Sequence, residues 1–122
     1  MSKRMIENDC LILSDENGGK ILMIRESFDG DRVTLALDGN INMNVAHDFE
    51  DELTAAATVC NQIIVDFEHV EVISSVGIKA LLMVQRILDK RTDSMLKLTK
   101  MKKEVYEMFD EMGFVDLFDI EN

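Results

Sequence analysis

The apolar residues of this chain repeat with two different periods, one typical of strands and the other typical of helices. Residues 20–25 and 32–37 are short apolar runs, and the second alternates larger apolar side chains with smaller or polar ones. This pattern predicts two strands, of which the second is half-buried. Asp29-Gly30-Asp31 lies between the runs, and Asp-Gly between strands is a strong hairpin signal. We therefore expect residues 20–25 and 32–37 to pair antiparallel.

Helical spacing occurs in three later stretches. The first starts at Val45, after Asn44, which can cap a helix, and its apolar face is made by Val45, Phe49, Leu53, Ala56 and Cys60. The second helix is expected over residues 76–90 and the third over about 100–112, where Gly113 is placed to end it. The apolar residues that follow are expected to cover a sheet edge or to form a final strand: Phe114, Leu117, Phe118 and Ile120.

A strand, a helix and another strand are predicted in succession over residues 62–98. Residues 62–67 form an apolar run with β-branched residues, which is typical of a parallel strand covered on both faces, and residues 95–98 form a short strand. With the helix 76–90 between them they predict a βαβ unit, that is, two adjacent parallel strands joined by a right-handed crossover. The polar stretches 38–42 and 68–71 are predicted to be loops.

Residues 1–19 have a weaker pattern, and we treat them as an N-terminal extension of a domain that covers residues 20–122. Residues 10–13 are compatible with a short extra strand, and residues 15–19 are a clear turn.

The turn between the strand 62–67 and the helix 76–90 carries two hydroxyls and a glycine, in Ser74-Ser75-Val76-Gly77. A helix start has free backbone N–H groups and the positive end of the helix dipole, so it can hold a capping serine or a phosphate. Two interpretations of Ser75 stay open from these residues alone. It is either only an N-cap, or a residue whose phosphate would lie on the helix start.

Composition and charge exclude several classes of function. The 122 residues suffice for one domain, and the formal net charge of -11 argues against general nucleic-acid binding and against docking on anionic membranes. No apolar stretch is long enough to cross a bilayer, and no signal peptide is present. Two widely spaced cysteines, Cys10 and Cys60, suggest a reduced, cytoplasmic protein without a zinc or redox motif. No pattern for catalysis, a metal or a cofactor is found, so we expect no enzyme.

Lys100, Lys102 and Lys103 gather at the start of the third predicted helix, where the helix dipole disfavours cations. They are either ordinary solvated lysines or a local basic patch. Because the turns after parallel strands open on the same edge of a sheet, these lysines are expected close enough to residues 74–77 to influence a phosphate there.

The sequence from about Lys20 to Ile120 resembles the STAS family, the sulfate transporter and anti-sigma factor antagonist domain. The most specific part is Ile64-Val65-Asp66, Val70 and then Val72-Ile73-Ser74-Ser75-Val76-Gly77-Ile78. Residues 37–42 resemble the family's Gly-Glu-Leu-Asp loop, with both acids replaced by asparagine, and Met112-Gly113-Phe114 resembles the Gly-Leu after its last helix. The resemblance implies an α/β fold: a small, mostly parallel sheet with an N-terminal antiparallel strand and helices packed alongside.

The resemblance also implies a function. Bacterial members are phosphorylation switches, and their phosphoacceptor serine corresponds to Ser75. The unphosphorylated form binds an anti-sigma factor, often also a serine kinase, and a serine phosphatase restores binding after phosphorylation. Ser74, Val76, Gly77 and Ile78 would then form the partner-binding loop. The alternative is a non-enzymatic STAS subunit of a stress-signalling or lipid-transport assembly.

Overall fold

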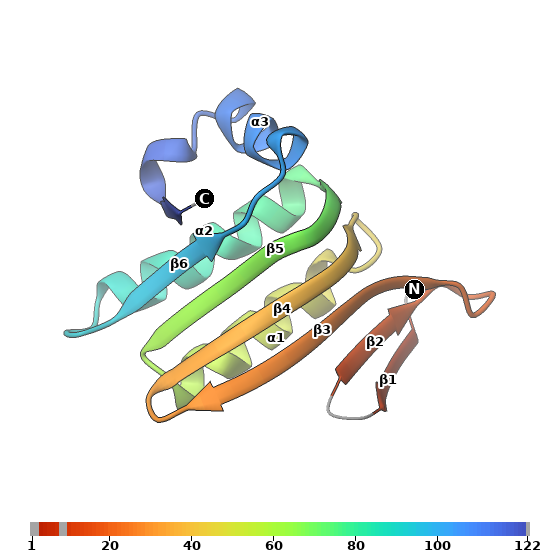
Figure 1. Ribbon diagram of the computed structural model, residues 1–122, viewed down its shortest axis with the longest axis horizontal. Helices are drawn as coiled ribbons and strands as arrows, with labels where there is room; N and C mark the ends of the chain where they lie inside the picture. Colours follow the sequence, from red (N-terminus) through yellow and green to blue (C-terminus); the bar gives the residue numbers. More distant parts are fainter. Residues whose placement is uncertain (1–2, 8–9, 122) are drawn as a thin grey trace.

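Within residues 3–7 and 10–121, which the computed structural model describes, seven strands form one sheet in the order in which they follow along the chain (Figure 1). The strands are β1 (Lys3–Glu7), β2 (Cys10–Ser14), β3 (Lys20–Asp29), β4 (Arg32–Ile41), β5 (Gln62–Ile73), β6 (Met95–Thr99) and β7 (Asp119–Glu121). The helices are α1 (Ala46–Val59), α2 (Ser75–Asp89), α3 (Lys103–Glu111) and the short 3-10 helix η1 (Val115–Leu117).

The sheet is antiparallel from β1 to β4 and parallel from β4 to β7. The predicted hairpin is confirmed, with Asp29 of β3 paired with Arg32 of β4. The predicted βαβ unit is also confirmed: β5 and β6 are adjacent and parallel, and α2 connects them. The expected mixed α/β fold is therefore the observed one.

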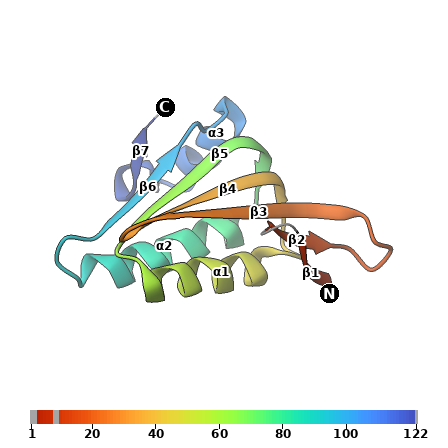
Figure 2. The ribbon, with the colours of Figure 1, turned by 60° about the horizontal axis from the view of Figure 1, so that its bottom comes forward.

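Helices α1 and α2 lie side by side along one face of the sheet, and α3 lies apart from them near β5 and β6 (Figure 2). Buried apolar side chains of the strands, such as Ile63 and Val65, form the core with these helices. Aromatic contacts hold α3 and the residues after it on the rest of the protein, because Phe109 of α3 packs edge-to-face between two other rings. Its ring centre lies 6.4 Å from that of Phe67 in β5 and 5.5 Å from that of Phe118.

Two predicted loops are wrong, because β4 continues to Ile41 and β5 continues to Ile73. For residues 68–71 the cause is an irregularity in β5: Ala36 of β4 pairs with Asp66, whereas Asp38 pairs with His69. The Asp66 carboxylate stabilises this shift by accepting a hydrogen bond from the Glu68 backbone N–H at 2.9 Å. The bulge interrupts the two-residue period, so residues 68–71 resemble a loop although the strand continues.

All three helix starts differ from the prediction, and that of α2 differs by one residue, because the helix begins at Ser75. Helix α1 begins at Ala46, and the Asn44 side chain does not cap it. The backbone N–H of Asn44 instead donates a hydrogen bond to the Asn42 side chain at 2.9 Å. Helix α3 begins at Lys103 and not at Lys100, because Lys100 has a φ of 57° and donates its backbone N–H to the carbonyl of Glu121 in β7. The end of α3 is as predicted, since Gly113 follows it with a φ of 73°.

The first strands extend the sheet. The expected strand at residues 10–13 is confirmed as β2, and its Leu11 and Leu13 belong to the main core. Residues 1, 2, 8, 9 and 122 lie outside the described part of the chain. The residues that follow Gly113 form both η1 and a short final strand, β7.

Candidate partner-binding site

The junction between β5 and α2 is built by Ser74, not by Ser75. The Ser74 side-chain oxygen accepts a hydrogen bond from the Gly77 backbone N–H at 3.1 Å, and its backbone carbonyl accepts one from Ile78 at 3.1 Å. Its own backbone N–H donates to the carbonyl of Ile41 at 2.7 Å, which joins the junction to the end of β4. Ser74 is therefore the N-cap, and the interpretation of Ser75 as the cap is wrong.

Ser75 is the first residue of α2 and is half-buried. Among the described residues, its hydroxyl has no hydrogen-bond partner. The first-turn N–H groups of a helix and its dipole favour negative charge at this position. The local geometry thus leaves one unused hydroxyl beside a helix start.

Gly77 and Ile78 support the junction from inside. Both are buried, and a Cβ atom on residue 77 would lie only 2.7 Å from Cγ2 of Ile41. A glycine at this position either leaves the backbone open to a partner or allows tight packing of the turn, and these contacts favour tight packing. Of the four residues of the predicted partner-binding loop, only Ser74 and Val76 keep exposed side-chain surface.

Exposed apolar side chains occur just before and just after the two serines and just after Ile41, whose carbonyl is bonded to Ser74. Met43, in the loop after β4, is 75% exposed, Val72 at the end of β5 is 55% exposed and Val76 is 40% exposed. We call Met43, Val72, Ser75 and Val76 the junction surface. Single exposed apolar residues are ordinary, but several at one site are typical of a protein-binding surface. Sequence reasoning missed Met43, which follows a predicted loop, and it placed Val72 in the family motif but not in the partner-binding loop.

Each of the three lysines predicted near the turn has an acidic partner. Lys100 Nζ lies 3.7 Å from Asp66, and Lys103 Nζ lies 3.8 Å from Glu107 on its own helix. Lys102 pairs with Glu71, three residues before Ser74, and is the only one of the three whose partner lies at this end of β5. A phosphate on Ser75 would compete with these carboxylates for any of the three lysines.

The described residues show no group of three or more His, Cys, Asp or Glu side chains that could hold a metal ion. His47 lies 3.3 Å from Asp51 on the exposed side of α1, and a backbone hydrogen bond and then Asp51 raise its pKa. None of the helices in the described part of the chain is long and apolar enough to span a membrane.

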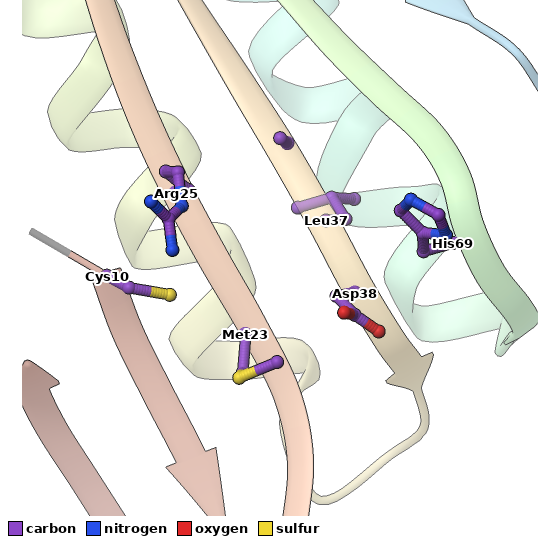
Figure 3. Close-up of a pocket in the computed structure, with 7 residues that line it drawn as sticks. Cys10, Met23, Arg25, Leu37, Asp38 and His69 are labelled. Carbon is purple, nitrogen blue, oxygen red and sulfur yellow. The ribbon is translucent and has the colours of Figure 1, made fainter. Parts of the chain in front are cut away.

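A shallow hollow lies on the face of the sheet away from α1 and α2 (Figure 3). Its apolar floor includes Cys10 and Met23, and its rim carries Arg25, Asp38 and His69 from β3, β4 and β5. None of the site residues predicted from the sequence lines it. Each rim side chain is exposed to solvent, so the hollow holds no buried polar group that would select a ligand.

The family model described as "Mlab, STAS domain" matches residues 24–119. That match covers more than half of the chain, and the chain belongs to the STAS domain family. It includes every predicted site residue, from Ser74 to Lys103. No curated protein matches the chain significantly.

Solved structures of STAS proteins share the fold at low sequence identity. A protein from Thermotoga maritima, described as a "putative anti-sigma factor antagonist", has a TM-score of 0.73 and 16% identity, over 81% of this chain and 86% of that one. One from Mycobacterium paratuberculosis has a TM-score of 0.73 and 18% identity, over 82% and 85%. The phosphorylated form of the Bacillus cell fate determinant SpoIIAA has a TM-score of 0.63 and 16% identity, over 81% and 90%.

Proposed function

We propose that this protein is a phosphorylation-controlled binding module of a bacterial partner-switching cascade, with Ser75 as the phosphoacceptor. The unphosphorylated form binds an anti-sigma factor that is also a serine kinase, and a serine phosphatase restores binding after phosphorylation. The module has no catalytic activity of its own and works in the cytoplasm. Similarity to anti-sigma factor antagonists, one of them solved in a phosphorylated form, supports the proposal.

The single observation that carries the proposal is the position of the Ser75 hydroxyl. It lies at the first residue of α2, makes no hydrogen bond within the described protein and stands among the exposed apolar side chains of the junction surface. Because Ser75 directly precedes Val76 at the start of α2, we expect a partner that covers Val76 to approach Ser75 closely. Modification of this hydroxyl would therefore act directly on the bound surface.

The phosphate blocks the partner without unfolding the protein. It adds about -1.5 to -2 charges at neutral pH. At an exposed helix start such charge is stabilising by roughly 0.3–1 kcal/mol, so α2 does not melt. The block comes from charge and bound water, which replace the close apolar contact that Val72 and Val76 offer.

The test compares two variants in a reaction with the matched kinase. Ser75→Ala is expected to fold, to resist phosphorylation and to keep its partner. Ser75→Asp is expected to melt within a few degrees of the unmodified protein and to bind far more weakly. Phosphate found only on Ser74 contradicts the assignment of the site, and a large loss of melting temperature in Ser75→Asp contradicts the mechanism.

A second candidate is a non-enzymatic STAS subunit of a stress-signalling or lipid-transport assembly. The matching family model carries the name Mlab and not that of an anti-sigma factor antagonist, and the junction surface would suit a permanent subunit contact as well. The intact mass of protein from cells, with and without phosphatase treatment, separates the two functions. A permanent subunit carries no phosphate and co-purifies with its assembly, whereas a switch protein shows a phosphatase-sensitive mass.

A further inference from the structure

Helix α2 presents a narrow row of exposed side chains that begins beside Ser75. The row is spaced by three and four residues and consists of Val76, Lys79, Met83, Arg86 and Lys90. At 3.6 residues per turn these positions lie on one side of the helix, away from the buried residues Leu81, Val84 and Leu88. We call this row the α2 stripe. It is continuous with the junction surface through Val76.

The charge of the α2 stripe is opposite to that of the protein. It carries three cations and no acid, in a chain with a formal net charge of -11. Lys79, Arg86 and Lys90 have no ion-pair partner among the described residues. In contrast, four lysines from β6 to the start of α3 are each paired with an acid: Lys97, Lys100, Lys102 and Lys103.

Neighbouring groups leave the stripe's cations free. The one acid of α2, Asp89, accepts a hydrogen bond from Gln85 at 2.9 Å, and Arg91 beyond the helix donates to the Ala57 carbonyl at 2.5 Å. The acidic residues of α1 lie in its first half, at positions 48 and 50–52. Since α1 and α2 both start at the same edge of the sheet, the second half of α2 is the part farther from these acids.

We propose that the α2 stripe docks an acidic amphipathic helix of a partner protein. The inference takes one thing from the proposed function, namely that a partner binds at the junction surface. The α2 stripe continues from that surface. Val76 and Met83 offer two apolar contacts about two helical turns apart, and the three cations around them match carboxylates on the edges of a partner helix. Complementary charge speeds the association of the right partner and disfavours binding of wrong ones. This is important for an acidic protein, because the rest of its surface repels acidic partners.

An anionic membrane is the other occupant that a basic and apolar helix face could take. Membrane-surface helices insert large side chains such as Trp, Phe or Leu. Val76 of the stripe is 40% exposed and Met83 is 39% exposed, whereas the other apolar side chains of α2 are buried or half-buried. The structure therefore favours a protein partner.

The test is photo-crosslinking in the cells that make the protein, with p-benzoylphenylalanine in place of Met83. A matched control places the same group at Thr54, an exposed position on α1. The expected result is a crosslink from position 83 to an acidic helical segment of one protein, identified by mass spectrometry, and none to that segment from position 54. No crosslink from position 83, a segment without excess acid, or a crosslink to lipid would overturn the proposal.

Charge reversal then tests the role of the cations with a synthetic peptide of the captured segment. Arg86→Glu is expected to weaken binding at least tenfold, and Lys103→Glu, which changes an exposed lysine on α3 by the same charge, is expected to leave it unchanged. Equal effects of both variants overturn the proposal. The result is separable from the proposed function: if no phosphate is found on Ser75 in the cell but the peptide still binds through Arg86, the switch fails and the docking surface stands.

Discussion

Gly77 and Ile41 lie so close together that a Cβ atom on residue 77 would stand 2.7 Å from Cγ2 of Ile41. The same atom would stand 3.1 Å from Cγ1 of Ile73, and both isoleucines are buried. Gly77→Ala should therefore lower the free energy of unfolding, by about 1 kcal/mol. Overpacking costs roughly 1–3 kcal/mol, and alanine regains at most about 1 kcal/mol of helix propensity. Urea denaturation measures the change.

A double-mutant cycle shows whether the close contact is the cause. In an Ile41→Ala background the Gly77→Ala substitution is expected to cost less, because the methyl group that it meets is gone. If Gly77→Ala raises the stability of the otherwise unchanged protein, the glycine is not required for packing.

Alanine substitutions of the two serines of the junction should differ in their effect on the free energy of unfolding. Ser74→Ala removes the hydroxyl that caps α2 and is expected to cost about 1 kcal/mol of unfolding free energy. Ser75→Ala removes a hydroxyl without a hydrogen bond and is expected to change stability by less than about 0.5 kcal/mol. Thermal and urea unfolding of both variants provide the comparison. An equal cost for the two would mean that Ser75 shares the capping role.

Most of the sheet could be predicted because its signals are local. The Asp-Gly turn fixed the β3–β4 hairpin, and the apolar run 62–67 followed by a helical stripe indicated the βαβ unit. The extension of β5 to Ile73 could not be predicted in the same way. It depends on a bulge in which a side chain, Asp66, bonds the backbone two residues later, and the pairing of His69 with Asp38 is a contact between distant parts of the chain.

The candidate site was predicted in position but not in its internal roles. Sequence alone could not decide which serine caps α2, since both precede the same apolar face and only the N–H of Gly77 distinguishes them. The partners of the lysines depend on tertiary contacts: Glu71 and Asp66 reach them from β5, more than thirty residues earlier in the chain. The sequence analysis predicted the helix that carries the α2 stripe, but the stripe's lack of ion-pair partners appears only in three dimensions.

The Cys60 thiol should be protected by the fold. Burial, and then the charges of Asp31 and Glu26, raise the pKa of Cys60. Because the pKa of this thiol is higher in the folded protein than in the unfolded chain, its contribution to the free energy of unfolding is complete at a pH below the unfolded pKa. That contribution is lost as the pH rises through the folded pKa. In a Cys10→Ala background, we expect Cys60 to react with a disulfide reagent at pH 8 only as fast as the protein unfolds. Rapid reaction of the native protein would contradict the burial of this thiol.

A phosphate on Ser75 should be held by Lys79. Residues four apart on a helix are neighbours on its surface, and Lys79 has no other partner among the described residues, whereas Lys100, Lys102 and Lys103 each bind a carboxylate. A nearby cation favours the doubly charged phosphate and so lowers the pKa of its second ionisation.

Phosphorus NMR of the protein with phosphoserine at position 75, followed across a pH titration, measures the midpoint of that ionisation. Lys79→Gln is expected to raise the midpoint by roughly 0.2–0.4 pH units, as for an exposed pair on a helix. Lys103→Gln, with its partner Glu107 on its own helix, serves as the control and should leave it unchanged. If Lys102→Gln moves the midpoint and Lys79→Gln does not, the phosphate has displaced Glu71 and the basic cluster at the start of α3 is its partner.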